Sequence, residues 1–167
     1  MMAENQNAGA VDFDAIFDAL GKGATLGDAA GLSQNALEAG YGMAFNLYNA
    51  GNYANAEKLF AALCVYDHHD ERFWNGLAGS RQANGNLEGA IDAYNMATVA
   101  GALGNPAPSV HAGLCYLKLG DTENASALFN AAIELGQPDN SEHQAYRERA
   151  RAMFELIAEG NPAGAQP

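Results

Sequence analysis

The chain has 167 residues, of which 49% are hydrophobic, and its 8 Lys and Arg residues against 20 Asp and Glu residues give a formal net charge of −12. This length suits one domain with a continuous core. The charge repels nucleic acid and anionic membrane surfaces and favours neutral or basic partners. No apolar run reaches the ~20 residues of a membrane span, and the first residues lack the pattern of a secretory signal. We therefore expect a cytosolic protein that neither binds nucleic acid nor inserts into membranes.

The first 33 residues are predicted to start with disorder and continue with a helix. Residues 1–10 are small and polar, which is typical of a disordered terminus. Phe13, Ile16, Phe17 and Leu20 then follow the i, i+3, i+4, i+7 spacing of one helix face. Residues 11–33 are therefore expected to hold an amphipathic helix and a linker.

A spaced pattern occurs three times in the middle of the chain. Each copy has a small residue, a Gly seven positions later, an Ala five positions after that and an aromatic residue four positions further on. The alanines are Ala56, Ala90 and Ala125, so the steps are 34 and 35 residues. A period of 34 with these landmarks is the signature of the tetratricopeptide repeat (TPR). The sequence predicts an all-α TPR solenoid over 34–136, with repeats at about 37–70, 71–105 and 106–140.

Each landmark has a physical role in a helix pair. Gly51, Gly85 and Gly120 are expected to end the first helix of each pair, where a left-handed residue satisfies free carbonyls. Small residues allow the helices to approach closely, and the aromatic residues fill the space between stacked pairs. Helices are predicted at 34–50, 53–66, 71–84, 87–100, 108–119 and 122–135. The small residues are Ala44, Ala78 and Gly113 together with the three alanines, and the aromatic residues are Phe60, Tyr94 and Phe129.

The chain is expected to close with a capping helix. Ser141 to Gln144 has the pattern of a capping box, which starts a helix over 141–160. Its mixture of Arg and Glu suits a solubilising cap on a solenoid. Residues 161–167 are predicted to be a disordered tail.

The sequence offers little for catalysis, metals or cofactors. Cys64 and Cys115 lie in apolar stretches without ligand spacing, so they are interpreted as buried thiols, with a disulfide or metal role as the minor alternative. The run from Asp67 to Glu71 holds two adjacent histidines and is interpreted as a solvated turn, with Asp70 as the N-cap of the next helix. No nucleotide-binding, serine-hydrolase or zinc-protease motif is present. We expect no enzymatic activity, no cofactor and no metal.

The first helix of each repeat lines the concave face of a TPR solenoid, and residues three, four and seven apart share a face there. Two readings of the aromatic stripe in the first repeat are open. It lines a groove or it belongs to the core, and the groove is favoured because Gly40, Met43, Ala44 and Leu47 already occupy the core-facing positions. A groove of this kind suits an extended apolar peptide, and it lacks the Lys and Asn of carboxylate-clamp TPRs. The expected groove residues are Tyr41, Phe45, Tyr48 and Tyr53 from the first repeat, Arg72, Asn75 and Gln82 from the second, and Val110, Leu114 and Leu117 from the third.

From about Leu37 to Gly136 the sequence resembles the class II chaperones of bacterial type III secretion systems. The most specific strings are ALCVYDHHD, starting at Ala62, and GLAGSRQANG, starting at Gly76. The resemblance implies a bacterial cytoplasmic adaptor that is not an enzyme and that holds hydrophobic translocator subunits through an extended segment in the concave groove. It also implies groove roles for Tyr66 and Trp74 and a possible homodimer. The alternative is a TPR scaffold that assembles another multi-protein complex.

Overall fold

The computed structural model describes residues 13–160, and within them all regular structure is helical. The predicted all-α class is confirmed. Both expectations of disorder, for residues 1–10 and 161–167, lie outside the described residues. The helices are α1 (Phe13–Gly21), α2 (Leu26–Ala29), α3 (Gln34–Asn49), α4 (Tyr53–Tyr66), α5 (Glu71–Ala83), α6 (Leu87–Ala100), α7 (Ala107–Lys118), α8 (Thr122–Glu134) and α9 (Ser141–Gly160).

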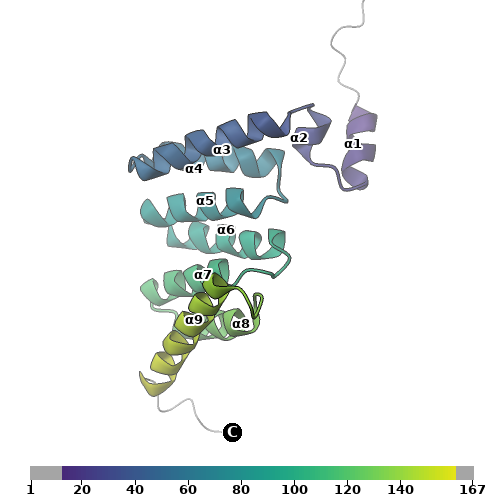
Figure 1. Cartoon of the computed structure of the whole chain (residues 1–167). Helices are drawn as coiled ribbons and strands as arrows, with labels where there is room; N and C mark the ends of the chain where they lie inside the picture. Colours follow the sequence, from purple (N-terminus) through teal and green to yellow (C-terminus); the bar gives the residue numbers. More distant parts are fainter. Residues whose placement is uncertain (1–12, 161–167) are drawn as a thin grey trace, which may run out of the picture.

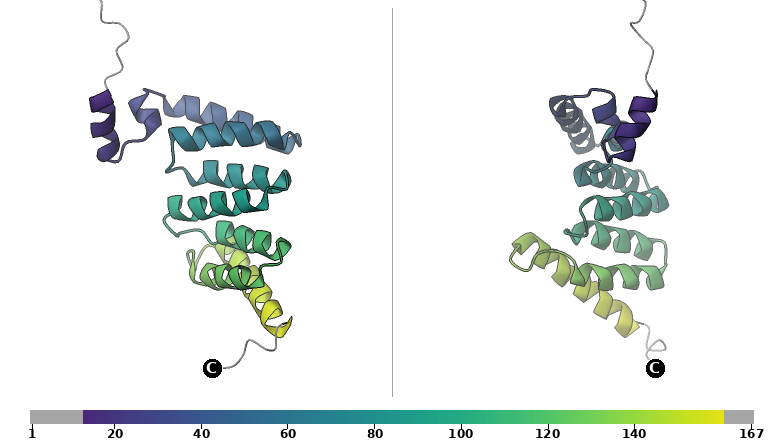
Figure 2. Two further views of the ribbon diagram at one scale, coloured as in Figure 1. Left: turned by 180° about the vertical axis from the view of Figure 1, so that it is seen from behind. Right: turned by 90° about the vertical axis from the view of Figure 1, so that its right-hand side faces the viewer.

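Helices α3 to α8 form three antiparallel pairs that stack in one direction (Figure 1). Each helix packs on the next along the chain, and α9 packs on both α8 and α7. The two further views in Figure 2 show that α9 crosses the last pair obliquely at one end of the stack. The short helix α2 packs on α4, and α1 packs on α2. None of the helices in residues 13–160 is long and apolar enough to span a membrane.

Three glycines end the first helices of the pairs, as predicted. Gly51, Gly85 and Gly120 have φ of 76°, 83° and 81°, a left-handed conformation that costs glycine little. Asp70 is the N-cap of α5, because its side chain accepts a hydrogen bond from the backbone N–H of Arg72. These termini fix the length of the helices that line the concave face.

The start of α9 differs from the prediction. The side-chain oxygen of Asn140 accepts hydrogen bonds from the backbone N–H groups of Glu142 and His143 at 2.9 and 3.1 Å. Asn140 therefore has the capping role that the sequence pattern assigned to Ser141. The side chain of Gln144 donates to the carbonyl of Pro138 and makes no bond of a capping box.

The core is built from the landmark positions of the repeat. The small landmark residues are all buried, and the aromatic ones fill the space that they leave. Phe60 is 1% exposed, and its ring lies so close to Gly76 of the next pair that a Cβ there would be 2.2 Å from it. Phe129 is completely buried against Gly113 in the same way. Glycine at these positions lets the ring lie directly on the neighbouring helix.

Three details of the described residues were not predicted. Met43, expected in the core, is 61% exposed. Helix α2 had been assigned to a linker; Thr25 caps it, and its hydroxyl and backbone N–H both bond to Asp28. In the loop after α6, Ala102 and Leu103 have φ of 50° and 61°, so two residues with side chains adopt the left-handed region there.

Candidate functional site

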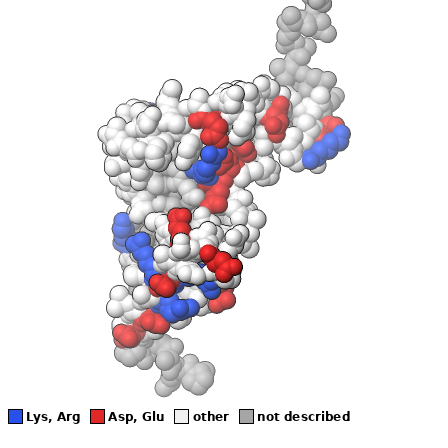
Figure 3. Space-filling model, viewed as in Figure 1, with Lys and Arg blue, Asp and Glu red and all other residues white. Residues whose placement is uncertain are grey.

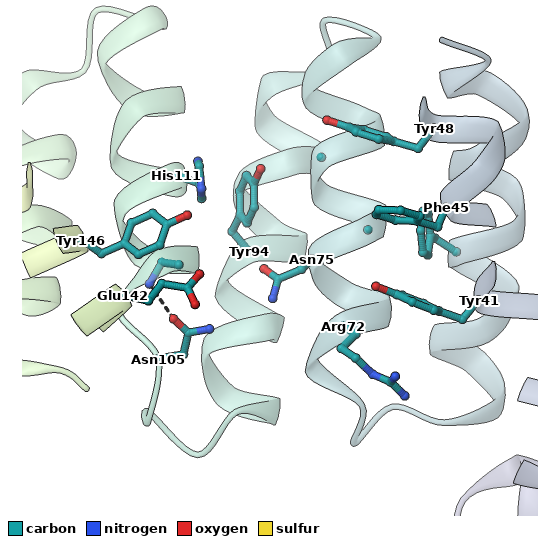
Figure 4. Close-up of a pocket in the computed structure, with 14 residues that line it drawn as sticks. Tyr41, Phe45, Tyr48, Arg72, Asn75, Tyr94, Asn105, His111, Glu142 and Tyr146 are labelled. Carbon is teal, nitrogen blue, oxygen red and sulfur yellow. Dashed lines mark hydrogen bonds between the residues drawn. The ribbon is translucent and has the colours of Figure 1, made fainter. Parts of the chain in front are cut away.

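The concave face of the stack holds a cavity of about 430 Å³. Figure 4 shows its lining side chains pointing toward a common space from both sides. One wall comes from α3, the floor comes from α5, and the opposite wall comes from α6, α7 and α9. The lining residues are Tyr41, Phe45, Tyr48, Phe60, Arg72, Asn75, Gly76, Gly79, Tyr94, Asn105, Ala107, His111, Glu142 and Tyr146.

The α3 wall is aromatic, and its residues are only partly covered. Tyr41 and Phe45 stack with ring centres 6.1 Å apart, and Phe45 is 48% exposed. Tyr41 is half-buried, and its ring also contacts Phe60 and Phe73 of the core, at 6.0 and 5.9 Å. The stripe therefore combines the two readings that the sequence left open. Its inner edges pack on the core, and its outer edges face the cavity.

Tyr48 extends this wall and is held from two sides. Its ring meets the ring of Tyr53 edge to face at 5.2 Å. Across the cavity floor, a Cβ on Gly79 would lie 3.5 Å from the Tyr48 ring. Because Gly79 has no side chain, no side-chain atom at this position of the floor projects into the cavity beside the Tyr48 ring.

Arg72 closes one corner of the cavity as part of an ion network. Its guanidinium lies 4.9 Å from the centre of the Tyr41 ring and pairs with Glu38 and Asp70, each at 2.6 Å. The hydrogen bond from Arg72 holds the pKa of Glu38 below its usual value. Two carboxylates thus neutralise the charge of Arg72. For this reason this corner of the cavity attracts an acidic ligand only weakly.

The polar part of the floor is tied together by Glu71. Its carboxylate accepts hydrogen bonds from the side-chain amides of Asn75 and Asn105, at 3.2 and 2.6 Å. Asn105 in turn accepts a hydrogen bond from the backbone N–H of Ala107 at 2.9 Å (Figure 4). These bonds hold the amide groups in fixed positions in a cavity whose other wall is aromatic.

The opposite wall is a row of three rings from three helices. His111 stacks on Tyr94 at 5.4 Å and meets Tyr146 of α9 edge to face at 5.7 Å. The hydroxyl of Tyr94 donates to the side-chain oxygen of Gln82 at 2.9 Å. Burial, with the charge of Arg149 as a smaller cause, lowers the pKa of His111. The imidazole is therefore kept neutral at physiological pH.

A second cavity of about 490 Å³ continues the concave face toward the C-terminal end of α7. It shares His111 with the first cavity, so the two adjoin there. Leu114 and Leu117 give it an apolar lining, and Lys118 and Arg149 add two cations. Its lining residues are Gln82, His111, Leu114, Leu117, Lys118 and Arg149.

Most of the groove residues expected from the sequence line these two cavities. The first contains Tyr41, Phe45, Tyr48, Arg72 and Asn75, and the second contains Gln82, Leu114 and Leu117.

Four expected residues line neither cavity. Val110 is completely buried, packed in a core cluster with Ala150 of α9, and its assignment to the groove was wrong. Trp74 donates from its indole N–H to the carbonyl of His68 at 2.9 Å and packs against the core. Tyr53 supports Tyr48 from behind, and Tyr66 lies at the end of α4 near α2.

The contribution of the opposite wall was missed. Glu142, Tyr146 and Arg149 all come from α9, which was assigned only a capping role. Their spacing of four and three residues places them on one helix face, and that signal was available in the sequence. Tyr94 was expected as a core landmark; it is 6% exposed, and its ring also borders the first cavity.

The described residues 13–160 contain no group of three or more His, Cys, Asp or Glu side chains arranged to hold a metal ion. His68 and His69 contact each other with ring centres 4.0 Å apart. Cys64 and Cys115 are both buried and unbridged, and burial raises the pKa of the Cys64 thiol to about 12. The site offers apolar surface and hydrogen-bonding groups to a ligand.

Comparison with known proteins identifies the family. Two tetratricopeptide-repeat models match residues 37–70 and 110–139. The low calcium response locus protein H of Yersinia pestis is 36% identical over 135 residues, which cover 81% of this chain and 79% of that protein. A type III secretion complex from Aeromonas hydrophila superimposes with a TM-score of 0.82 at 35% identity, covering 90% of this chain and 99% of that one.

The translocator chaperone SycD of Yersinia enterocolitica has been solved bound to a peptide of the translocator YopD. That structure has a TM-score of 0.71 at 36% identity and covers 78% of this chain and 98% of that one. SycD has also been solved in an alternative dimer, with a TM-score of 0.70. The fold, the concave aromatic cavity and these relatives agree, and the chain belongs to the family of TPR chaperones that serve type III secretion translocators.

Proposed function

We propose that this protein is a chaperone that binds hydrophobic translocator subunits of a type III secretion system in the bacterial cytoplasm. An extended apolar segment of the client lies on the concave face, and its side chains contact the aromatic wall of α3. The observation that carries this proposal is a cavity of about 430 Å³ with half-exposed aromatic residues, in a protein related to a chaperone that holds a translocator peptide.

The physical reason for such a complex is the cost of apolar surface in water. Removing apolar area from water stabilises a complex by about 25 cal/mol per Å², and Phe45, at 48% exposure, is an anchor of the kind that dominates interfaces. A client with membrane-inserting segments would aggregate if these were left free. The formal net charge of −12 on this chain keeps the complex apart from other complexes by repulsion.

The same arrangement supports an adaptor without enzymatic activity. Two of the ionisable groups that border the first cavity are engaged in structural contacts: Arg72 pairs with two carboxylates, and His111 stacks on Tyr94. The hydrogen-bonded amides of the floor suit the backbone of an extended peptide. The dimer of SycD supports a homodimer for this chain as well.

Co-expression with translocators encoded beside the chaperone gene tests this function. We expect a soluble, stoichiometric complex in which a segment of the translocator is protected from limited proteolysis. Phe45→Asp should abolish the complex, because a charge would be buried against the aromatic wall.

Met43→Asp is the matched control. Met43 lies on the same helix and is 61% exposed, and it does not line the first cavity, so the same charge change there should leave the complex intact. Recovery of the complex with Phe45→Asp, or its loss with Met43→Asp, would contradict the proposed binding face. A protein that leaves every translocator insoluble, yet joins other proteins of the system, would instead be the TPR scaffold.

A further inference from the structure

We propose that the second cavity recognises a carboxylate of the client, carried by an acidic residue close to the apolar anchors in the first cavity. The proposal rests on the proposed function and adds a specificity to it. Clients would then be selected by an apolar stretch together with an adjacent Asp or Glu, and the carboxylate would fix the direction in which the segment lies.

Two cations in the lining of the second cavity carry this inference. Lys118, in the last turn of α7, and Arg149, on α9, both line the second cavity. Neither makes a salt bridge with a carboxylate of residues 13–160, whereas Arg72 and Arg81 both do. The lining of the second cavity holds these two cations and no Asp or Glu, in a chain with 20 acidic and 8 basic residues.

The distribution of charge over the molecule points the same way. Four of the 8 basic residues of the chain, Lys118, Arg147, Arg149 and Arg151, belong to α7 and α9. Figure 3 shows blue side chains over the lower half of the face, where these helices lie, with red ones between them. The same two helices also carry Glu142, Glu148, Glu155 and Glu159, so their charges sum to zero while the whole chain carries −12. Beside burial, the charge of Arg149 contributes to the lowered pKa of His111 at the shared boundary of the cavities.

The concave face is consequently polarised along α9. Glu142 borders the first cavity, Tyr146 lies one turn later, and Arg149 borders the second cavity. Together with Glu71 under the floor, Glu142 makes the first cavity unfavourable for a carboxylate. An acidic residue of the client is therefore favoured at only one end of the concave face, the end formed by the second cavity.

The lining of the second cavity also fits the shape of such a residue. Leu114 and Leu117 offer apolar contact for the methylene groups of a Glu side chain, and the two cations would meet its carboxylate. His111 and Lys118 are seven residues apart, which is about 10 Å along a helix at 1.5 Å per residue. About three residues of an extended peptide, at ~3.3 Å each, cover that distance. The acidic residue should thus lie about three positions from an apolar anchor.

The experiment measures the affinity of the protected translocator segment from the co-expression experiment, synthesised as a fluorescein-labelled peptide. One version keeps its Asp and Glu, and a second carries Asn and Gln instead. Each is titrated by fluorescence anisotropy against the wild type, the Lys118→Gln/Arg149→Gln variant and a Lys58→Gln/Arg151→Gln control. The control changes the net charge by the same amount at exposed cations that line neither concave cavity.

We expect the Lys118→Gln/Arg149→Gln variant to bind the acidic peptide about tenfold more weakly than the wild type, as two partly exposed charge pairs would give. The wild type should bind the neutral peptide about tenfold more weakly than the acidic one. The variant should bind the two peptides equally, since changing the peptide and changing the cations remove the same interaction. The control variant should bind both peptides as the wild type does. The wild type's affinity for the acidic peptide should fall steeply as the salt concentration rises, and the other affinities should change little.

Equal affinities of the wild type and the Lys118→Gln/Arg149→Gln variant would overturn the inference and leave the proposed function standing. So would a protected segment without an acidic residue near its anchors, or an equal loss in the control. Absence of any translocator binding by the wild type would instead overturn the proposed function itself, and the inference with it.

Discussion

Truncating Phe45 to Ala should separate binding from folding, because half of this side chain is exposed to the cavity. Phe45 is 48% exposed and stacks on Tyr41 at 6.1 Å. Complete burial of a large apolar side chain stabilises a fold by about 1.5–3 kcal/mol. The half that is buried here therefore contributes about 1 kcal/mol, and Phe45→Ala should lower the free energy of unfolding by that amount.

The exposed half of Phe45 acts only when a client is bound. An aromatic anchor at the centre of an interface typically contributes about 2 kcal/mol or more, so the truncation should weaken binding of the translocator segment by about 30-fold. Chemical denaturation followed by circular dichroism measures the first quantity. Isothermal titration calorimetry measures the second.

Phe60→Ala is the contrasting variant. Phe60 is 1% exposed and lies directly on Gly76, so its removal leaves a cavity and should cost about 3–5 kcal/mol of stability. If Phe45→Ala destabilises the fold as much as Phe60→Ala does, the α3 stripe is core and the concave face is misassigned. Unchanged binding by a folded Phe45→Ala protein would refute the reasoning from the other side.

Three further predictions concern packing, pH and thiol chemistry. Gly76→Ala should destabilise the fold by about 1–3 kcal/mol in chemical denaturation, because the new Cβ would lie 2.2 Å from the Phe60 ring, whereas Gly42→Ala, with no atom within 4 Å, should stabilise α3 by about 0.5–1 kcal/mol. Burial lowers the pKa of His111, so the unfolded chain takes up the proton first, at about pH 6.5, and stability should fall below that pH; the loss between pH 7.5 and 5.5 should be smaller in His111→Gln, and an identical loss would contradict the assignment. The thiol of Cys64, with its pKa raised to about 12, should resist iodoacetamide at pH 8 until the protein is unfolded, as mass spectrometry of the alkylated peptide would show.

The comparison of sequence and structure is clearest at equivalent positions of the repeats. Met43, Leu77 and Ala112 occupy the same place in α3, α5 and α7, separated by steps of 34 and 35 residues. Leu77 and Ala112 are buried at 3% and 0% exposure, because a preceding pair covers each of them. No complete pair precedes α3 in the described residues, so Met43 is 61% exposed. A repeat pattern alone carries no information about which copy is first.

The same reasoning explains the error at Val110. It is equivalent to Tyr41 and Asn75, which both line the first cavity. At the last pair, however, α9 folds back on α7, and Val110 packs in one cluster with Ala150. The repeat period predicted correctly that Val110 lies on the face of α7 that corresponds to Tyr41 and Asn75. It carried no information that α9 covers this face, because that depends on the path of the chain after α8.

The sequence by itself determined the features that recur in each repeat, namely the helix ends, the core positions and the face of each helix. Helix ends at Gly51, Gly85 and Gly120 follow from the left-handed conformation that glycine tolerates. The core follows from small and aromatic residues at fixed spacing, and the aromatic wall on α3 follows from the helical period. Only the tertiary structure decided how the groove is completed, because α9 crosses the last pair and brings Tyr146 and Arg149 against a face that lies tens of residues earlier in the chain. Contacts of that kind depend on the direction in which one helix leaves the stack, and no local pattern of residues specifies that direction.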